Sequence, residues 1–162
     1  TAQNLGAGKK ERIRDGFGAG IRLVWLLCIP IVLLYLLAGR LLVHFFMDMP
    51  TETALSSGVW FLRIVAPFYF LISVKLVADG ILRGAGMMRK FMISTFTDLI
   101  LRVILTRILA KLMGSTGIWC AWPVGWTIGM GLSVLFYRRG FGRKGAESGG
   151  EQPPAAGTTP RR

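Results

Sequence analysis

The sequence predicts an all-α, polytopic membrane protein with four transmembrane helices. Of its 162 residues, 52% are hydrophobic and 17% are charged, whereas a typical soluble domain carries about 25% charged residues. The apolar residues also gather in four long blocks. Each block reaches the length of roughly 20 residues that a helix needs to cross a hydrocarbon core about 30 Å thick. The blocks are Ile21–Met47, Val59–Arg83, Phe91–Met113 and Ile118–Tyr137.

The segments on either side of these blocks have a different composition. Residues 1–20 are rich in Gly and basic residues and predict the end of a truncated helix followed by a cytoplasmic loop. Residues 138–162 begin with basic residues and continue with Gly, Pro and polar residues. Such a segment buries too little apolar surface to order itself, so a disordered basic cytoplasmic tail is expected. Because the chain opens on Thr1 inside a helical pattern, we interpret it as a piece of a longer protein.

The basic residues alternate between the junctions of the predicted spans. Lys and Arg are frequent in residues 1–20, in Arg83–Lys90 and after Tyr137, whereas Asp48–Gly58 contains none. Loops rich in Lys and Arg stay in the cytoplasm, so both ends of this chain are expected there. Orientation therefore accounts for the net charge of +12 without a nucleic-acid partner. The lipid bilayer is the expected partner of the apolar blocks.

Four charged residues fall inside the predicted membrane region. Lys75 and Asp79 lie four residues apart in the second block, and Asp98 and Arg102 lie four apart in the third. A charge at the centre of a membrane costs roughly 2.5–3.5 kcal/mol on insertion scales, so such residues usually face a protein interior or a water-filled cavity. In an antiparallel pair of helices, Lys75 and Asp98 are expected at the same level, and the four side chains could neutralise one another.

Two interpretations of this cluster remain open. The ion pairs could only hold two helices in register. Alternatively, they could line a cavity and bind or relay a cation, with Asp98 and then Asp79 as the carboxylates that exchange H⁺ or Na⁺. The sequence contains one His and no cluster of metal ligands or nucleophile motif, so neither an enzyme, nor a metal site, nor an organic cofactor is predicted.

Smaller features concern helix packing. Gly125 and Gly129 form a GxxxG pattern, which we expect to pack within the same protein rather than to drive dimerisation. Cys28 and Cys120 are expected at opposite membrane depths as two free, buried thiols. Arg40 and His44 are expected to extend from the outer end of the first span to the membrane surface. Proline is expected to bend three of the spans, at Pro30, Pro67 and Pro123.

Several segments resemble multidrug and toxic compound extrusion (MATE) transporters. The opening TAQNLGAGKKER resembles the loop after their eighth helix, through Gln3, Asn4, Gly6, Gly8 and Arg12. GILRGAG, which contains Arg83, Gly84 and Gly86, resembles the cytoplasmic end of the tenth helix. STFTDLILRV and GIWCAWPVGW resemble helices eleven and twelve of bacterial members. The resemblance covers residues 1–137.

This resemblance implies a carboxy-terminal fragment, helices nine to twelve, that forms part of a six-helix transporter lobe. Such transporters export cationic or amphipathic compounds by antiport with H⁺ or Na⁺. The implied partners are cationic small molecules and the missing amino-terminal helices, and the implied location is a bacterial inner membrane. Two alternatives remain: a lipid-linked precursor flippase with a basic cavity of Lys75, Arg63 and Arg102, or a non-transporting subunit that packs through the GxxxG face.

Overall fold

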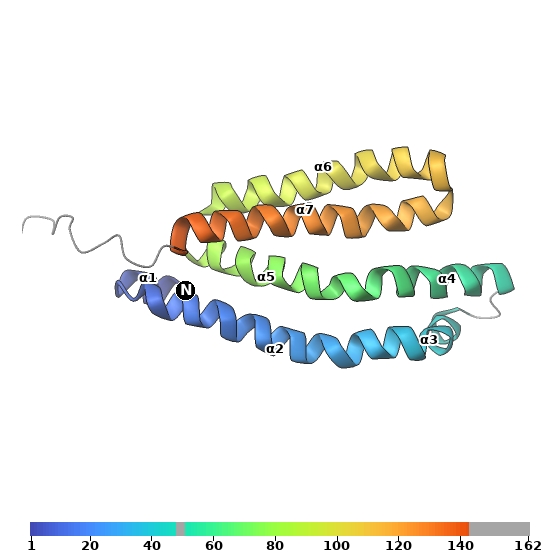
Figure 1. Ribbon diagram of the computed structural model, residues 1–162, viewed down its shortest axis with the longest axis horizontal. Coiled ribbons are helices and arrows are strands. Elements are labelled where there is room, and N and C mark those ends of the chain that lie inside the picture. The colour runs from blue at the N-terminus through green and yellow to red at the C-terminus, as the bar shows by residue number, and fades with distance from the viewer. Residues whose placement is uncertain (48–50, 143–162) are drawn as a thin grey trace, which may run out of the picture.

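The computed structural model describes residues 1–47 and 51–142, and within them the chain forms helices joined by short turns (Figure 1). An all-α fold was predicted, and the described residues confirm it. In chain order the elements are α1 (Ala2–Gly6), α2 (Lys10–Leu37), α3 (Gly39–Phe46), α4 (Glu52–Val65), the 3₁₀ turn η1 (Ala66–Phe68), α5 (Tyr69–Gly84), α6 (Met88–Met113) and α7 (Ser115–Phe141).

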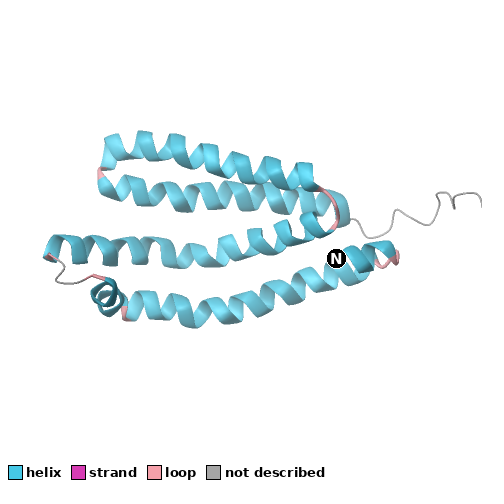
Figure 2. Cartoon of the chain, turned by 180° about the vertical axis from the view of Figure 1, so that it is seen from behind, coloured by secondary structure: helices cyan, strands magenta, loops and turns pink. Residues whose placement is uncertain are grey.

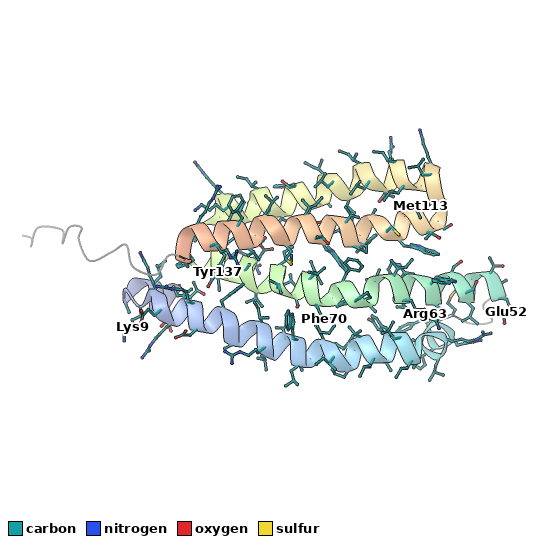
Figure 3. The ribbon with its side chains drawn as sticks, in the orientation of Figure 1. Lys9, Glu52, Arg63, Phe70, Met113 and Tyr137 are labelled. Atoms are coloured by element: carbon teal, nitrogen blue, oxygen red, sulfur yellow. The ribbon has the colours of Figure 1, made fainter. Side chains whose placement is uncertain are left out.

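The long helices lie side by side in the order α2, α4–α5, α7, α6 (Figures 1 and 2). Helices α4, α5 and α7 run from the α3–α4 end of the bundle toward its opposite end, and α2 and α6 run the other way. Helix α7 packs against both α5 and α6, so the fourth predicted span lies between the second and the third. The N-terminus, the α5–α6 turn and the end of α7 share one end of the molecule, here called the basic end. Helix α3 and the α6–α7 turn lie at the other, the α3 end. Figure 3 shows Lys9 and Tyr137 near the first and Glu52 and Met113 near the second.

Three stretches are long and apolar enough to cross a membrane: Lys10–Leu37, Glu52–Gly84 and Ser115–Phe141. They confirm the class of a polytopic membrane protein. The remaining predicted span, Phe91–Met113, is one continuous helix within the 26 residues of α6 but is not among the three. The difference lies in composition, because α6 carries charged residues among its apolar ones: Arg89, Lys90, Asp98, Arg102, Arg107 and Lys111.

The predicted loop over residues 1–20 is mostly helical. Helix α2 begins at Lys10, so the loop is confined to Ala7–Lys9, where Gly8 has the left-handed φ of +69° that favours glycine. Packing explains the longer helix: Ile13 is buried, and a Cβ built on Gly20 would lie 3.2 Å from Val77 of α5. At the other end α7 continues to Phe141, so the predicted tail starts inside a helix. Its residues 143–162 lie outside the described part.

The first predicted span is not one helix to Met47. Helix α2 ends at Leu37, and α3 then turns across the ends of the long helices (Figure 1). Gly39 at this break lies against α4, where its Cβ would be 3.5 Å from Leu62 Cδ1. Arg40, the next residue, is paired with an acidic side chain. Both carboxylate oxygens of Glu52 accept hydrogen bonds from Arg40 Nη2, at 3.1 and 3.2 Å.

Proline interrupts the second predicted span. Pro67 lies in η1, which separates α4 from α5, because proline donates no backbone hydrogen bond and clashes with the preceding turn. Pro30 and Pro123 lie within α2 and α7, which continue past them as α-helix. Both cysteines are free thiols, as predicted; Cys28 is buried and Cys120 is partly buried.

Candidate functional site: two ion pairs on either side of a glycine face

Two ion pairs, one buried and one partly buried, lie on α5 and α6. On α5, Lys75 Nζ lies 2.6 Å from Asp79 Oδ2, and these residues are 4% and 2% exposed. On α6, Arg102 Nη2 lies 2.8 Å from Asp98 Oδ2, and Asp98 is 7% exposed. Each pair joins residues four apart on one helix, as the spacing predicted. Lys75, Asp79 and Asp98 are therefore held inside the helix bundle, and Arg102, whose side chain is 22% exposed, lies at its edge.

Helix α7 brings the two pairs together at Gly129. A Cβ built on Gly129 would lie 2.8 Å from Lys75 Cε and 3.1 Å from Asp98 Cβ. Lys75 and Asp98 therefore lie at the same level, as predicted. The expected ion pairing between helices is not formed, because α7 passes between α5 and α6 at this level and each carboxylate pairs along its own helix.

The GxxxG pattern of α7 is occupied by these side chains. A Cβ on Gly125 would lie 2.7 Å from Asp98 Oδ1, closer than real Cβ atoms approach a neighbour. Gly125 and Gly129 thus allow Asp98 and Lys75 to approach the α7 backbone. The expected packing within the same protein is confirmed.

Replacing Gly129 by alanine is expected to lower the free energy of unfolding by about 1–2 kcal/mol, because the added methyl group overpacks the contact with Asp98. Gly131→Ala is the matched control, since nothing lies within 4 Å of a Cβ there. Thermal unfolding of both variants in detergent measures the difference. Equal melting temperatures would show that Gly129 is not the close contact described here.

A chain of hydroxyl groups connects the α5 pair to the backbone of α7. Ser133 Oγ lies 2.5 Å from Asp79 Oδ1, and Ser94 Oγ of α6 lies 2.6 Å from Ser133 Oγ. Ser94 Oγ also lies 3.0 Å from the carbonyl oxygen of Gly129. Both serines are fully buried. Asp79 is therefore bound by Lys75 through one oxygen and by the serine chain through the other.

The α6 pair is less completely satisfied. Asp98 Oδ1 and Arg102 Nε are buried and have no hydrogen-bond partner among the described residues, and neither has Thr95 Oγ1, one turn before Asp98. The guanidinium carbon of Arg102 lies 4.5 Å from the ring centroid of Trp122, a cation–π contact. The two carboxylates therefore differ: Asp79 has partners at both oxygens, and Asp98 at one.

The sequence matches the MatE family over residues 1–108, more than half of the chain. The chain belongs to the MatE family. It is also 27% identical over 137 residues to the probable multidrug resistance protein YpnP of Bacillus subtilis (strain 168). That match covers 84% of this chain and 28% of the relative, so the chain spans less than a third of the relative's length. No solved structure matches the chain.

The residues of this MatE chain that resemble transporter motifs shape its basic end. Gly8 and Gly86 both adopt a left-handed φ, at +69° and +72°, in the turns after α1 and α5. A Cβ on Gly84 would lie 2.9 Å from Thr1 Cβ, so the two motif segments contact each other. The carbonyl oxygens of Gln3 and Asn4 accept hydrogen bonds from Ala7 and Lys9 in the same turn. Arg83 lies over the ring of Phe91, at 5.0 Å.

The sequence analysis did not identify Ser94 or Ser133 as members of the site. Their spacing held a usable signal: Ser94 lies four residues before Asp98, and Ser133 lies four after Gly129, so each shares a helix face with a site residue. The contact of Trp122 with Arg102 was not anticipated either.

Proposed function

We propose that this chain is part of a transporter that exports cationic or amphipathic compounds in exchange for protons, and that Asp79 binds the coupling proton. Family membership and the relative named as a probable multidrug resistance protein support the export of such compounds. The hydroxyl chain that ends on Asp79 supports the choice of ion and residue. A bacterial membrane with both ends of the chain in the cytoplasm is the location that we propose with it.

The number of hydrogens available to the chain of hydroxyl groups supports a proton on Asp79. Three close oxygen contacts run from Asp79 through Ser133 and Ser94 to the carbonyl of Gly129. Each hydrogen bond needs one hydrogen, and two serine hydroxyls supply two. With Asp79 ionised, Ser133 donates to Asp79 and Ser94 donates to Gly129, which leaves the 2.6 Å contact between the serines without a hydrogen. A proton on Asp79 supplies the third, and all three contacts become hydrogen bonds.

The coordination chemistry also favours a proton over Na⁺ at Asp79. A hard metal cation takes several oxygen ligands, whereas a proton needs one. Both Asp79 oxygens already have partners, Lys75 Nζ and Ser133 Oγ, so few positions remain open for the several contacts that a metal cation needs. A proton is therefore the ion that the surroundings of Asp79 suit best.

The two alternative functions are less well supported. A flippase for lipid-linked precursors needs a strongly basic cavity, but two of its three proposed cations, Lys75 and Arg102, are neutralised by Asp79 and Asp98. A scaffold that packs through the GxxxG face needs that face to be open, and side chains of the same chain fill it at Gly125 and Gly129.

Efflux of a cationic dye from cells that express the full-length protein tests the proposal. We expect Asp79→Asn to lower the initial efflux rate by about 5-fold or more. A factor of about 5 corresponds to the smallest coupling free energies usually found between two sites. Wild-type efflux should depend on the proton gradient and not on Na⁺. The Asp79→Asn variant should lose its response to the proton gradient.

Asp98→Asn serves as the comparison at the same membrane depth. If only Asp79→Asn removes the response to pH, the coupling proton is assigned to Asp79. If both variants keep wild-type efflux and pH response at equal expression, the ion pairs are structural and the proposed coupling is wrong. Efflux that follows the Na⁺ gradient instead would overturn the choice of ion.

A further inference from the structure

A pocket of about 260 Å³ opens at the α3 end, away from the charged pairs, between α2, α3 and α4. One part of its wall is apolar, with Leu36, Leu55 and Val59. The other part is polar and charged, with Arg40, Ser56, Glu52 and Arg63 beside the exposed ring of Trp60. Such a mixed wall suits an amphiphile rather than a purely apolar or purely polar ligand.

Helix α3 marks the depth of this pocket. It runs across the ends of the long helices and exposes Leu41, Phe45 and Phe46 at its surface (Figure 1). A short apolar helix of this orientation lies in the plane of a membrane interface. Its first residue, Gly39, lies against Val59 and Leu62 of α4. Arg63 follows directly after Leu62, so it lies at the level of α3.

The pocket has an excess of positive charge. Glu52 neutralises Arg40 by accepting two hydrogen bonds from Arg40 Nη2, and these bonds also hold that arginine in place. Arg63 lies on the same wall, is exposed, and has no acidic or hydrogen-bond partner among the described residues. Figure 3 shows Arg63 on α4 beside α3. An arginine without a counter-ion at an interface attracts an anion, and phosphate matches the planar guanidinium best.

We propose that this pocket binds an anionic phospholipid from the adjacent leaflet. Its phosphate would contact Arg63, with Arg40 close by, and the start of its acyl chain would lie against Leu36, Leu55 and Val59. The binding would seat α3 against α4 at the membrane surface. The inference is independent of the proposed efflux, and its test measures lipid binding alone.

Quenching of tryptophan fluorescence tests the proposal in the full-length protein purified in a nonionic detergent. The titrant is phosphatidylglycerol with brominated acyl chains, and Trp60→Phe defines the part of the signal that comes from Trp60. We expect saturable quenching of that part. Arg63→Gln should weaken the apparent affinity about tenfold, the usual loss for one charged hydrogen bond. Arg63→Lys should lose less.

Four controls make each outcome decisive. Arg139→Gln removes a charge at the basic end and should leave the quenching unchanged. Thermal unfolding of Arg63→Gln should match that of the wild type, and Arg40→Gln replaces it as the test if it does not. Binding is contradicted if both arginine variants quench like the wild type, or if a brominated neutral diacylglycerol quenches equally. If inorganic phosphate reverses the quenching at low millimolar concentration, the site takes free phosphate and the lipid is wrong.

Discussion

At a pH at which Asp79 is ionised, replacing Lys75 by methionine is expected to lower the free energy of unfolding by about 3–5 kcal/mol, the cost of leaving one partner of a buried ion pair unpaired. Asp79 is 2% exposed and contacts Lys75 Nζ at 2.6 Å, so water cannot replace the lost charge. Methionine has a similar length and fills the space beside Gly129, which separates the loss of charge from the loss of volume. Denaturation of the purified protein in mixed micelles measures the effect.

A second substitution distinguishes this cause from general damage. Replacing a whole buried ion pair by apolar residues is often neutral. The double variant Lys75→Met with Asp79→Leu should therefore recover most of the lost stability, to within about 1–2 kcal/mol of the wild type, with the remainder assigned to Ser133, which loses its acceptor. If the double variant is less stable than Lys75→Met alone, the two residues do not act as one neutral pair.

The second large effect is expected at Gly117, near the turn between α6 and α7. A Cβ built there would lie 2.0 Å from the backbone carbonyl oxygen of Leu109 and 2.4 Å from its carbon. Backbone cannot move aside as a flexible side chain does, so Gly117→Ala must separate α6 from α7 near this turn. We expect a loss of about 3 kcal/mol, the upper range for a methyl group added to a packed interior.

The control for Gly117 is Gly80→Ala on α5, where nothing lies within 4 Å of a Cβ. That variant should keep or slightly raise the stability, because alanine favours a helix over glycine by about 1 kcal/mol. The melting temperature in detergent measures both. A Gly117→Ala variant as stable as Gly80→Ala would contradict the close approach of α6 and α7 described here.

Much of the fold followed from the sequence because long apolar blocks have few ways to satisfy their backbone in lipid. The helices over the second, third and fourth blocks were predicted in type and approximate position. The start of α2 was wrong because glycine was interpreted as a loop former, whereas Gly20 is needed for contact with Val77. The break at Gly39 was missed because Ala38–Met47 remains apolar, and the change from a spanning helix to one across the surface depends on packing against α4.

The candidate site was predicted in part. Spacing of four residues correctly placed Lys75 with Asp79 and Asp98 with Arg102 on their own helices, and the antiparallel turn placed Lys75 level with Asp98. The sequence could not show that α7 lies between α5 and α6, because helix order is a tertiary property. For the same reason Ser94 and Ser133, from two different helices, could not be joined to Asp79 before the structure was known.

Infrared difference spectroscopy measures the protonation of Asp79 directly. Full-length protein in lipid is compared between high and low pH, and the carboxylic-acid C=O stretch is followed. We expect a band from a buried protonated carboxyl that is lost in Asp79→Asn, is kept in Asp98→Asn, and shifts in Ser133→Ala. A band that Asp79→Asn leaves unchanged would contradict the account.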